Sequence, residues 1–512
     1  MRTISKATLS LVCASVLLSA TNSLAQANDK VYSVINLHNA KAENPDIDGT
    51  GVVVGVVDSV FNTNNPIIQD KLIDSINNII IPEHFAGEDL AVLMMHGAMV
   101  SSLIVGDSTE FKGVANGATF YGLALLNPSP SYAGNIKADV QKMIDSGVKV
   151  INHSYNLPVF PLINRWWGDD LESIYVSNNS VTAIDQSGFQ ELINESIRDL
   201  QRAQALAELS KNQGILNIVG VGNDGFSSPG ANAVLASYDE GYRGLLAVGG
   251  LNAEKVTIQD GNITIGGITQ DDRTAAINKW SQGTGDKSEV ILNELIDKQG
   301  IYTSSNFFAN SASLYGIMAP AQNITVANGM YGYQYYDADT QHTVTNSSTL
   351  AITSGTSLSA PLVSGVAALV EQKFPFLNGS QIADILLTTA NKNVTTPKLV
   401  VTENTGATGS SEFYSIFYID HEVPKHNGGS INWEQVKQDL KNAGFKADEN
   451  DNGVAEYIVK NLLKSHADAV IKNKANSVAV MKLSKEDFIG SGILDASKAL
   501  KGLAALNINR LN

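Results

Sequence analysis

One stretch decides how this chain folds: Thr353-Ser354-Gly355-Thr356-Ser357-Leu358-Ser359-Ala360-Pro361. Small and branched apolar residues follow it as far as Val370. Glycine gives the backbone freedom beside a serine, and proline fits the first turn of a helix because its missing N–H costs nothing there. The stretch therefore predicts a helix that Pro361 starts, with Ser357 just before it. The free N–H groups and the dipole of a helix N-terminus favour negative charge, which suits a nucleophilic serine, although serine is also a common plain cap.

Apolar runs of strand length recur along the chain, and helical patterns separate them. Strands are predicted at 49–58, 118–126, 148–152, 215–221 and 244–249, with helices at 101–106, 136–146 and 189–212. This alternation indicates an α/β fold with a mostly parallel central sheet covered by helices on both faces. Ligands bind beyond the carboxyl ends of such strands. Asp58 and Asn223 follow two of these ends and are therefore candidate site residues.

Length and composition limit the class of protein. The 512 residues are enough for one large domain with insertions or for two or three domains. Hydrophobic residues make up 43% and charged residues 17%, as in ordinary soluble globular proteins. The formal net charge of −16 argues against nucleic acid and anionic membrane surfaces as partners.

The first residues form a secretory signal peptide in this interpretation. Arg2 and Lys6 precede an apolar run, and small residues near position 27 offer a cleavage site. A membrane anchor is the alternative, but the apolar run is too short to span a bilayer comfortably. The only cysteine, Cys13, lies inside this segment, so the mature chain has no disulfide. We expect an exported bacterial protein, periplasmic or secreted, with no membrane span in the mature chain.

Two regions interrupt the alternation of strands and helices, at 158–188 and at 398–487. The second is predicted to be a helical subdomain, with helices at 432–443 and 454–472. The turn between them resembles the first half of a calcium loop, with candidate ligands Asp448, Asn450 and Asn452. The twelfth loop position is valine where a bidentate glutamate is needed, which favours a solvated helix–helix turn. We expect no required cofactor, and calcium remains an open candidate.

These observations predict the domain organisation of the chain. Residues 1–27 are the signal peptide, 28–397 the main α/β domain carrying the insertion 158–188, 398–487 the inserted helical subdomain, and 488–512 the segment that closes the main domain.

Acyl transfer by serine needs a hydroxyl, an imidazole that takes its proton and a carboxylate that orients the imidazole. The chain offers Asp58 at a strand end, His96 just before a predicted helix and Ser357 just before another. The order Asp, His, Ser is that of subtilisin and differs from the orders in chymotrypsin and the α/β-hydrolases.

With these residues in place, the chain resembles the subtilisin-like serine proteases. Val57-Asp58-Ser59 is similar to the family's aspartate motif, His96-Gly97 to its histidine motif and 355–361 to its serine motif. Lesser similarities occur at 113–115, 118–119, 150–155, 221–225, 316–320 and 490–496. The resemblance implies a subtilisin-like three-layer sandwich. The segment 35–49 is similar to the autotransporter-linked branch of the family, although we expect no C-terminal β-barrel here.

The resemblance also implies a role for each matching residue. Ser357 would be the nucleophile, His96 the general base and then acid, and Asp58 the group that orients His96. Asn223 would form the oxyanion hole with the backbone N–H of Ser357. An extended polypeptide substrate would lie between two walls, made of Ser154, Tyr155 and Asn156 on one side and Gly220, Val221 and Gly222 on the other.

The sequence departs from the family pattern near the histidine and the aspartate. Val60 stands where glycine is usual, and Ala98 and Met99 replace threonine and histidine. These changes leave the catalytic efficiency open. The interval between residues 27 and 49 is too short for the usual folding propeptide. We therefore expect the domain to fold unaided or with a protein partner or chaperone, for which the 398–487 subdomain is the candidate docking element.

A serine endopeptidase is the leading interpretation, and two others compete with it. A catalytically weakened, protease-like module that only binds peptides would keep the cleft without the chemistry. A lipase or esterase of the α/β-hydrolase type would need glycine at position 359, where this chain has serine, and would place the acid after the nucleophile.

Overall fold

The computed structural model describes residues 27–79, 88–126, 135–155, 202–223, 225, 229–230, 233, 242–267, 299–308, 312–337, 342–397, 399–405, 412–419 and 477–502. Several sequence predictions fall outside these ranges. They are the signal peptide as far as residue 26, Asn156, the insertion 158–188, the helices at 432–443 and 454–472, and the calcium candidates Asp448, Asn450 and Asn452.

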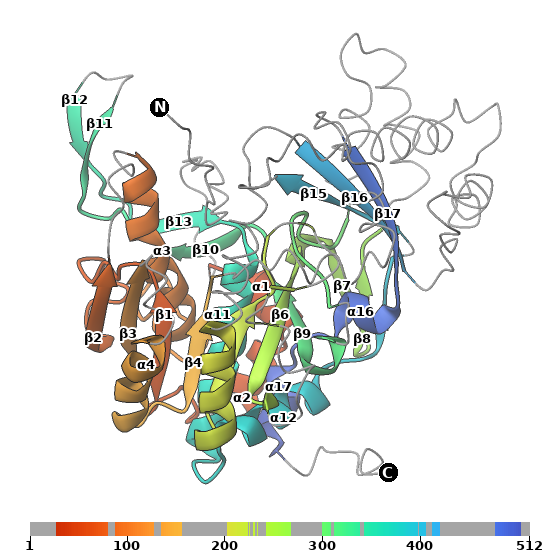
Figure 1. Cartoon of the computed structure of the whole chain (residues 1–512), viewed down its shortest axis with the longest axis horizontal. Helices are drawn as coiled ribbons and strands as arrows, with labels where there is room; N and C mark the ends of the chain where they lie inside the picture. Colours follow the sequence, from red (N-terminus) through yellow and green to blue (C-terminus); the bar gives the residue numbers. More distant parts are fainter. Residues whose placement is uncertain are drawn as a thin grey trace, which may run out of the picture.

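A seven-stranded sheet forms the centre of the molecule, with the strand order β2-β3-β1-β4-β5-β6-β9 (Figure 1). Every neighbouring pair in this sheet is parallel, which confirms the predicted α/β class. The strands are β1 (Val53–Asp58), β2 (Leu72–Ile79), β3 (Thr119–Leu126), β4 (Val150–His153), β5 (Leu216–Gly220), β6 (Leu245–Leu251) and β9 (Gly316–Pro320).

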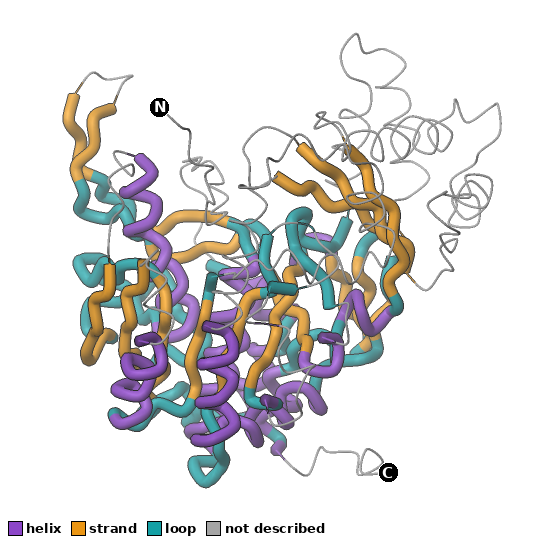
Figure 2. The backbone as a smooth tube through the Cα atoms, viewed as in Figure 1, coloured by secondary structure: helices purple, strands orange, loops and turns teal. Residues whose placement is uncertain are grey.

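Helices cover both faces of this sheet, which is why its central strands are continuous buried runs rather than alternating patterns (Figure 2). On one face, α4 (Asn135–Asp145) and a helix at 202–213 pack in one cluster with Val57 of β1. On the other face lie α3 (Glu88–Val105), α11 (Thr356–Lys373) and α12 (Gly379–Thr389).

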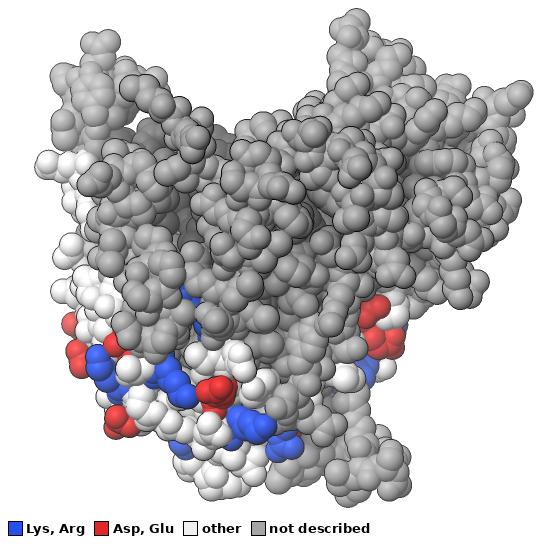
Figure 3. Space-filling model, in the orientation of Figure 1, with Lys and Arg blue, Asp and Glu red and all other residues white. Residues whose placement is uncertain are grey.

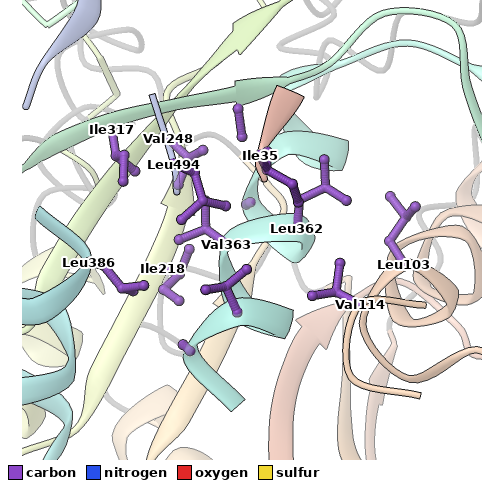
Figure 4. Close-up of a cluster of buried hydrophobic side chains, with 14 of the residues drawn as sticks. Ile35, Leu103, Val114, Ile218, Val248, Ile317, Leu362, Val363, Leu386 and Leu494 are labelled. Carbon is purple, nitrogen blue, oxygen red and sulfur yellow. The ribbon is translucent and has the colours of Figure 1, made fainter. Parts of the chain in front are cut away.

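Helix α11 is the buried axis of the second face. Its residues are almost all buried, as its run of small and branched apolar side chains requires. Leu362 and Val363 of α11 lie in one cluster with Ile218 and Val248 of the sheet (Figure 4). The helix therefore holds its first residues at a fixed height beside the carboxyl ends of the strands.

Smaller sheets surround the central one. They are β10 (Ile324–Ala327) with β13 (Leu350–Thr353), the hairpin β11 (Gln334–Asp337) with β12 (His342–Thr345), β14 (Val394–Thr395) with β8 (Asn262–Ile265) and β7 (Val256–Gln259), and β15 (Leu399–Thr405) with β16 (Glu412–Ile419) and β17 (Ser477–Leu483). Short 3-10 helices occur at η4 (Ala253–Lys255) and η5 (Ala312–Tyr315).

The two ends of the described chain pack together. The first helices are α1 (Asp29–Val34) and α2 (Leu37–Glu43), and the last are α16 (Lys485–Ile489) and α17 (Ala496–Leu500). The side chain of Asn36 donates a hydrogen bond to Asp495 Oδ1 at 2.8 Å, and Ser497 Oγ donates to Glu43 at 2.8 Å. The buried side chains of Val34 and Ile35 join the same core as α17.

The structure corrects two predicted helix starts. His96 does not precede a helix, because α3 begins at Glu88 and places His96 inside it. The apolar residues 90–95 favour helix and contain no capping residue that would delay the start. Pro361 does not start α11 either, since the helix begins at Thr356 and contains Pro361.

The two ends of the region 398–487 contain strands that the sequence analysis did not predict, and its two expected helices lie outside the described residues. Its described residues form the start of α16 and the strands β15, β16 and β17, which pair in one sheet. Their sequences are rich in β-branched and aromatic residues, as Leu399-Val400-Val401 and Phe413-Tyr414 illustrate, and this composition favours strand. The sheet is fastened to the main domain by Thr402, whose buried Oγ1 donates to the carbonyl of Gly225 at 2.9 Å.

The described surface carries charges of both signs. On the face shown in Figure 3, described Lys and Arg side chains are interspersed with Asp and Glu. Among the described residues, no helix has the length and apolar character needed to cross a bilayer.

Candidate active site

Asp58 and His96 form a hydrogen-bonded pair at the carboxyl end of β1. Asp58 is 4% exposed, and its Oδ1 lies 2.7 Å from Nδ1 of His96. Because a carboxylate only accepts, Nδ1 carries the proton of a neutral ring and Nε2 is left as the basic nitrogen. Burial alone lowers the pKa of His96, but the charge of Asp58 and its hydrogen bond outweigh burial, so this pKa lies above its usual value.

The loop after Asp58 fixes the helix that carries His96. The N–H of Gly97 donates to Ser59 Oγ at 3.0 Å. A Cβ at Gly97 would lie 2.7 Å from the carbonyl oxygen of Val60 and 2.9 Å from that of Ser59, so only glycine allows this approach. The departures Ala98 and Met99 are buried in the core and are no part of the exposed surface around the imidazole.

The same loop holds a projecting hairpin through two buried asparagines. Asn62 donates from Nδ2 to the carbonyls of Gly329 and Tyr331, at 2.7 and 2.9 Å. Asn65 donates to the carbonyls of Asn328 and Thr349, at 3.0 and 2.8 Å. These contacts tie the base of the β11–β12 hairpin, which projects beside α3 in Figure 1, to the loop that follows Asp58.

Ser357 is the second residue of α11 and is half-buried. The strand β13 leads into it, and Gly355 is the cap of the helix. A Cβ built on Gly355 would lie 2.9 Å from Ser357 Oγ and 3.5 Å from Nδ2 of Asn223. The missing side chain of Gly355 therefore leaves a space that the nucleophile and the amide both border.

Thr356 orients the side chain of Asn223. The N–H and the Oγ1 hydroxyl of Thr356 donate to Asn223 Oδ1, at 2.8 and 3.0 Å. Two donors to one atom identify it as the oxygen, so Nδ2 is the end of the amide that borders the space beside Ser357. This is the orientation that an oxyanion-hole donor requires.

The structure brings Asp58, His96, Ser357 and Asn223 to the carboxyl edge of one sheet. Val57 lies beside His153 in the pairing of β1 with β4, so Asp58, which ends β1, and Ser154, which directly follows β4, belong to neighbouring strand ends. Ser154 Oγ in turn lies 2.7 Å from the carbonyl oxygen of Ser357.

The residues of the two predicted substrate walls differ in their burial and in their hydrogen-bond partners. The hydroxyl of Ser154 is directed at the backbone of Ser357, and Tyr155 is half-buried. On the opposite wall, Val221 is fully buried, and the N–H of Gly222 donates to Thr356 Oγ1 at 3.3 Å. Gly220 lies in the buried strand β5.

His153 is a polar site residue that the sequence reasoning did not single out. It is buried, with Nε2 2.8 Å from Asn217 Oδ1 and Nδ1 3.0 Å from the hydroxyl of Tyr155. Because Asn217 Oδ1 only accepts, Nε2 is the donor and Tyr155 donates to Nδ1. Burial lowers the pKa of His153 to about 4, so the ring is neutral near pH 7. In the sequence, the only sign of this buried, hydrogen-bonded environment was the position of His153 in an apolar strand directly before Ser154.

Among the described residues, no group of three or more His, Cys, Asp or Glu side chains is arranged to hold a metal ion. Asp58, His96 and Ser357 are the three kinds of side chain that acyl transfer by a serine nucleophile requires.

The fold and this residue set define a serine peptidase of the α/β type, and the family comparison agrees. The model of the subtilase family matches residues 49–414, more than half of the chain. The chain therefore belongs to the subtilase family, and the resemblance predicted from the three motifs is confirmed.

Individual relatives are distant. The chain is 25% identical over 307 residues to the Neisserial autotransporter lipoprotein NalP of Neisseria meningitidis serogroup B, covering 58% of this chain and 23% of NalP. It is 22% identical over 351 residues to fervidolysin of Fervidobacterium pennivorans, covering 67% of this chain and 38% of fervidolysin. The chain thus spans less than half the length of both relatives.

Solved structures with a similar fold include the PatG macrocyclase domain, with a TM-score of 0.42 at 15% identity over 72% of this chain and 90% of that one. The MycP3 protease from the type VII (ESX-3) secretion system has a TM-score of 0.40 at 20% identity over 74% and 86% of the two chains. The fold assignment rests on the strand order and helix layers described above.

Proposed function

We propose that this chain is an exported serine endopeptidase that cleaves polypeptides through Asp58, His96 and Ser357. The observation that carries the proposal is the 2.7 Å contact between buried Asp58 and Nδ1 of His96. It leaves Nε2 as a base at the edge of the sheet where α11 presents Ser357. The pair is intact in spite of the departures at Val60, Ala98 and Met99, which favours an enzyme over a module that only binds peptides.

The reaction proceeds in two acyl transfers. Ser357 Oγ attacks the scissile carbonyl carbon while His96 Nε2 takes its proton, and Asp58 stabilises the resulting imidazolium. The oxyanion forms where Asn223 Nδ2 and the N–H of Ser357 donate to it. The C–N bond then breaks, and His96 returns the proton to the leaving amine. Water next attacks the acyl-enzyme with His96 as base, which releases the acid and restores Ser357.

The supporting experiment is covalent labelling of the folded mature protein with a fluorophosphonate, followed by mass spectrometry of the labelled peptide. We expect one adduct on Ser357, its absence in Ser357→Ala, and cleavage of casein by the unmodified protein. A folded protein that takes no label and leaves casein intact would refute the endopeptidase proposal. Retention of the full biological effect by Ser357→Ala would instead support the peptide-binding module.

Export and ion dependence belong to the same proposal. The apolar segment after Lys6 is expected to direct export and to be removed near residue 27, which fractionation and N-terminal sequencing of the mature protein would test. The catalytic residues need no metal for this chemistry. Casein cleavage with and without a chelator would show whether calcium at Asp448, Asn450 and Asn452 supports the fold.

The region 398–487 is proposed to regulate access to the site or to bind a protein partner. Its strand β15 is joined to the loop after Asn223 through the bond from Thr402 to Gly225. Deletion of 398–487 is expected to change the range of protein substrates. Unchanged folding, activity and substrate range in the deletion variant would refute this role.

A further inference from the structure

The carbonyl group of Ser357 lacks the donor that an α-helix ordinarily supplies to it. In an α-helix, the carbonyl of residue 357 accepts from the N–H of residue 361. Residue 361 is proline, which has no N–H and whose ring crowds the carbonyl four residues earlier. A buried carbonyl without a donor costs free energy, so this one needs a donor from elsewhere.

Ser154, the residue directly after strand β4, supplies that donor. Its Oγ lies 2.7 Å from the carbonyl oxygen of Ser357, and the residue is 5% exposed. The hydroxyl hydrogen of Ser154 therefore goes to the backbone of the nucleophile. The hydroxyl hydrogen of Ser154 is therefore not free to donate to a substrate, which leaves its oxygen and its backbone for the substrate role that the resemblance implied.

Two further buried side chains hold the hydroxyl of Ser154 in place. Asn152 Nδ2 donates to Ser154 Oγ at 2.8 Å, and Ser364 Oγ lies 2.9 Å from Asn152 Oδ1. Asn152 and Ser364 are both fully buried. Ser364 belongs to α11, one helical turn beyond Pro361, so the chain of bonds leaves the helix and returns to it.

The hydrogen bonds of this network run in one direction, from Ser364 towards the carbonyl of Ser357. Ser364 donates to Asn152, Asn152 to Ser154, and Ser154 to the carbonyl of Ser357. Aligned hydrogen bonds polarise one another in a medium of low dielectric constant. The hydroxyl of Ser364 is also 3.0 Å from the carbonyl of Ala360, so its hydrogen is shared between two acceptors.

We propose that Ser154 is a positioning residue for the nucleophile, held by Asn152 and Ser364, and that Pro361 is what makes it necessary. The proposal rests on the proposed function, because it assigns Ser154 to the reaction of Ser357. The bond from Ser154 fixes the first turn of α11. It thereby aims both Oγ and the N–H of Ser357 at the space that Gly355 leaves open beside Asn223.

The test exploits the missing N–H at residue 361. Ser154→Ala removes the donor and is expected to lower kcat about 10- to 100-fold with little change in KM, the size of loss that a small misplacement of a reacting group causes. Pro361→Ala restores a helical N–H for the Ser357 carbonyl. In the double variant Ser154→Ala/Pro361→Ala, most of the lost kcat should return. Ser154→Thr, which keeps a hydroxyl, should also retain activity.

Each measurement compares fluorophosphonate labelling rate, kcat, KM and thermal stability with those of the parent protein. Ser210→Ala is the matched control, because Ser210 is equally buried but bonds to Asn217 and Gly244 instead of the nucleophile. The positioning role is wrong if kcat is unaffected by Ser154→Ala, or if the loss persists unchanged in the double variant. A loss of stability at unchanged kcat would reduce Ser154 to a structural residue. Failure of the parent protein to take the label would instead refute the proposed function, and the positioning role with it.

Discussion

Among the buried carboxyl groups of the described residues, Asp58 and Glu371 lie at opposite ends of the parallel strands, and their surroundings differ. At the carboxyl edge, Asp58 has His96 at 2.7 Å and the N–H of Ser59 at 2.7 Å on the same oxygen. At the opposite edge, the ammonium of Lys149 lies 3.7 Å from Oε1 of Glu371, near the end of α11. Oδ2 of Asp58 and Oε2 of Glu371 are both buried without a hydrogen-bond partner among the described residues.

The surroundings of the two groups account for their different uses. Burial raises the pKa of Glu371 to about 7 because Lys149 offsets only part of the desolvation. Asp58 has a hydrogen-bonding imidazole beside it and raises the pKa of that imidazole. The carboxyl edge thus uses its buried charge to prepare a base, and the opposite edge carries a buried acid that titrates near neutral pH. Activity and stability should therefore respond to pH through different residues.

The largest predicted effect removes the chemistry from the carboxyl edge. Ser357→Ala should lower kcat by about a millionfold, the loss recorded for the corresponding serine of subtilisin. Stability should change little, because Ser357 is half-buried and its backbone bond to Ser154 remains. Peptide hydrolysis and urea unfolding test both points. Substantial hydrolysis by a purified Ser357→Ala protein would assign the reaction to another residue.

Asp58→Asn removes the buried negative charge at the carboxyl edge, which is the feature that distinguishes this edge from the opposite one. The amide removes the charge and presents the wrong partner to Nδ1, so we expect a loss of about 10⁴ in kcat, as in the corresponding chymotrypsin-type change. The parent protein should lose activity as pH falls through the raised pKa of His96, because the protonated ring cannot act as a base. In the variant, this acidic limb of the pH profile should move to lower pH. If the acidic limb of the pH profile does not move, Asp58 does not control the pKa of His96.

Asn223→Ala tests the contribution of a single hydrogen-bond donor at the carboxyl edge, the side-chain amide of Asn223. We expect kcat to fall about 10²- to 10³-fold with KM nearly unchanged, the size of effect known for the oxyanion asparagine of subtilisin. The hydrogen bonds from Thr356 hold Oδ1, so the amide is preorganised and its loss should appear in the transition state. Asn39→Ala, at an exposed position, serves as the control. An equal loss in both variants would remove Asn223 from the reaction.

The smallest predicted effect lies at the opposite edge and touches stability alone. Because the pKa of Glu371 is higher in the folded than in the unfolded state, the folded state binds more protons between about pH 4.5 and 7. Stability contributed by this group is complete below that range and is lost as pH rises through it. The parent protein should therefore lose on the order of 2 kcal/mol of unfolding free energy through Glu371 between pH 5 and pH 8. Glu371→Gln should not show this loss.

Urea titrations of the parent, Glu371→Gln and the exposed control Glu254→Gln at pH 5 and pH 8 measure this difference. The control should show the same pH dependence as the parent protein. An identical pH dependence in all three proteins would show that Glu371 does not titrate in this range. Casein hydrolysis by Glu371→Gln should match the parent, since the site is at the other edge.

The sequence predicted five of the seven central strands, all but β2 and β9, and named the polar residues that follow two of those strands. Continuous apolar runs that end in polar residues predicted β1, β3, β4, β5 and β6, because parallel strands buried on both faces cannot alternate. The catalytic serine motif was readable because glycine and proline restrict the backbone around it. The boundaries of α3 and α11 were less predictable, since helices begin where packing permits and both run beyond the motif that suggested them.

The remaining polar network depended on which residues meet across the sheet. The sequence around each residue does not indicate that Thr356 donates to Asn223. It also does not indicate that Ser154 replaces the N–H donor that Pro361 lacks. Those partners are separated by more than a hundred residues and meet only when β4 and β5 lie beside α11. Strand β2, at the edge of the sheet, was missed because its residues are polar and partly exposed. The strands β15 to β17 were missed because their region was interpreted as one helical unit.

The contact between the two ends of the described chain sets an order of events in folding. Asn36 meets Asp495, and Glu43 meets Ser497, across sequence separations of 459 and 454 residues. Closing so long a loop has an entropic cost that local helix formation does not share, and folding slows as contacts become more distant in sequence. During synthesis, the apolar side of α1 and α2 must wait for α17 to emerge. A chain that stops short of residue 495 would leave Val34 and Ile35 without part of their packing, so quality-control proteases could distinguish truncated copies from finished ones.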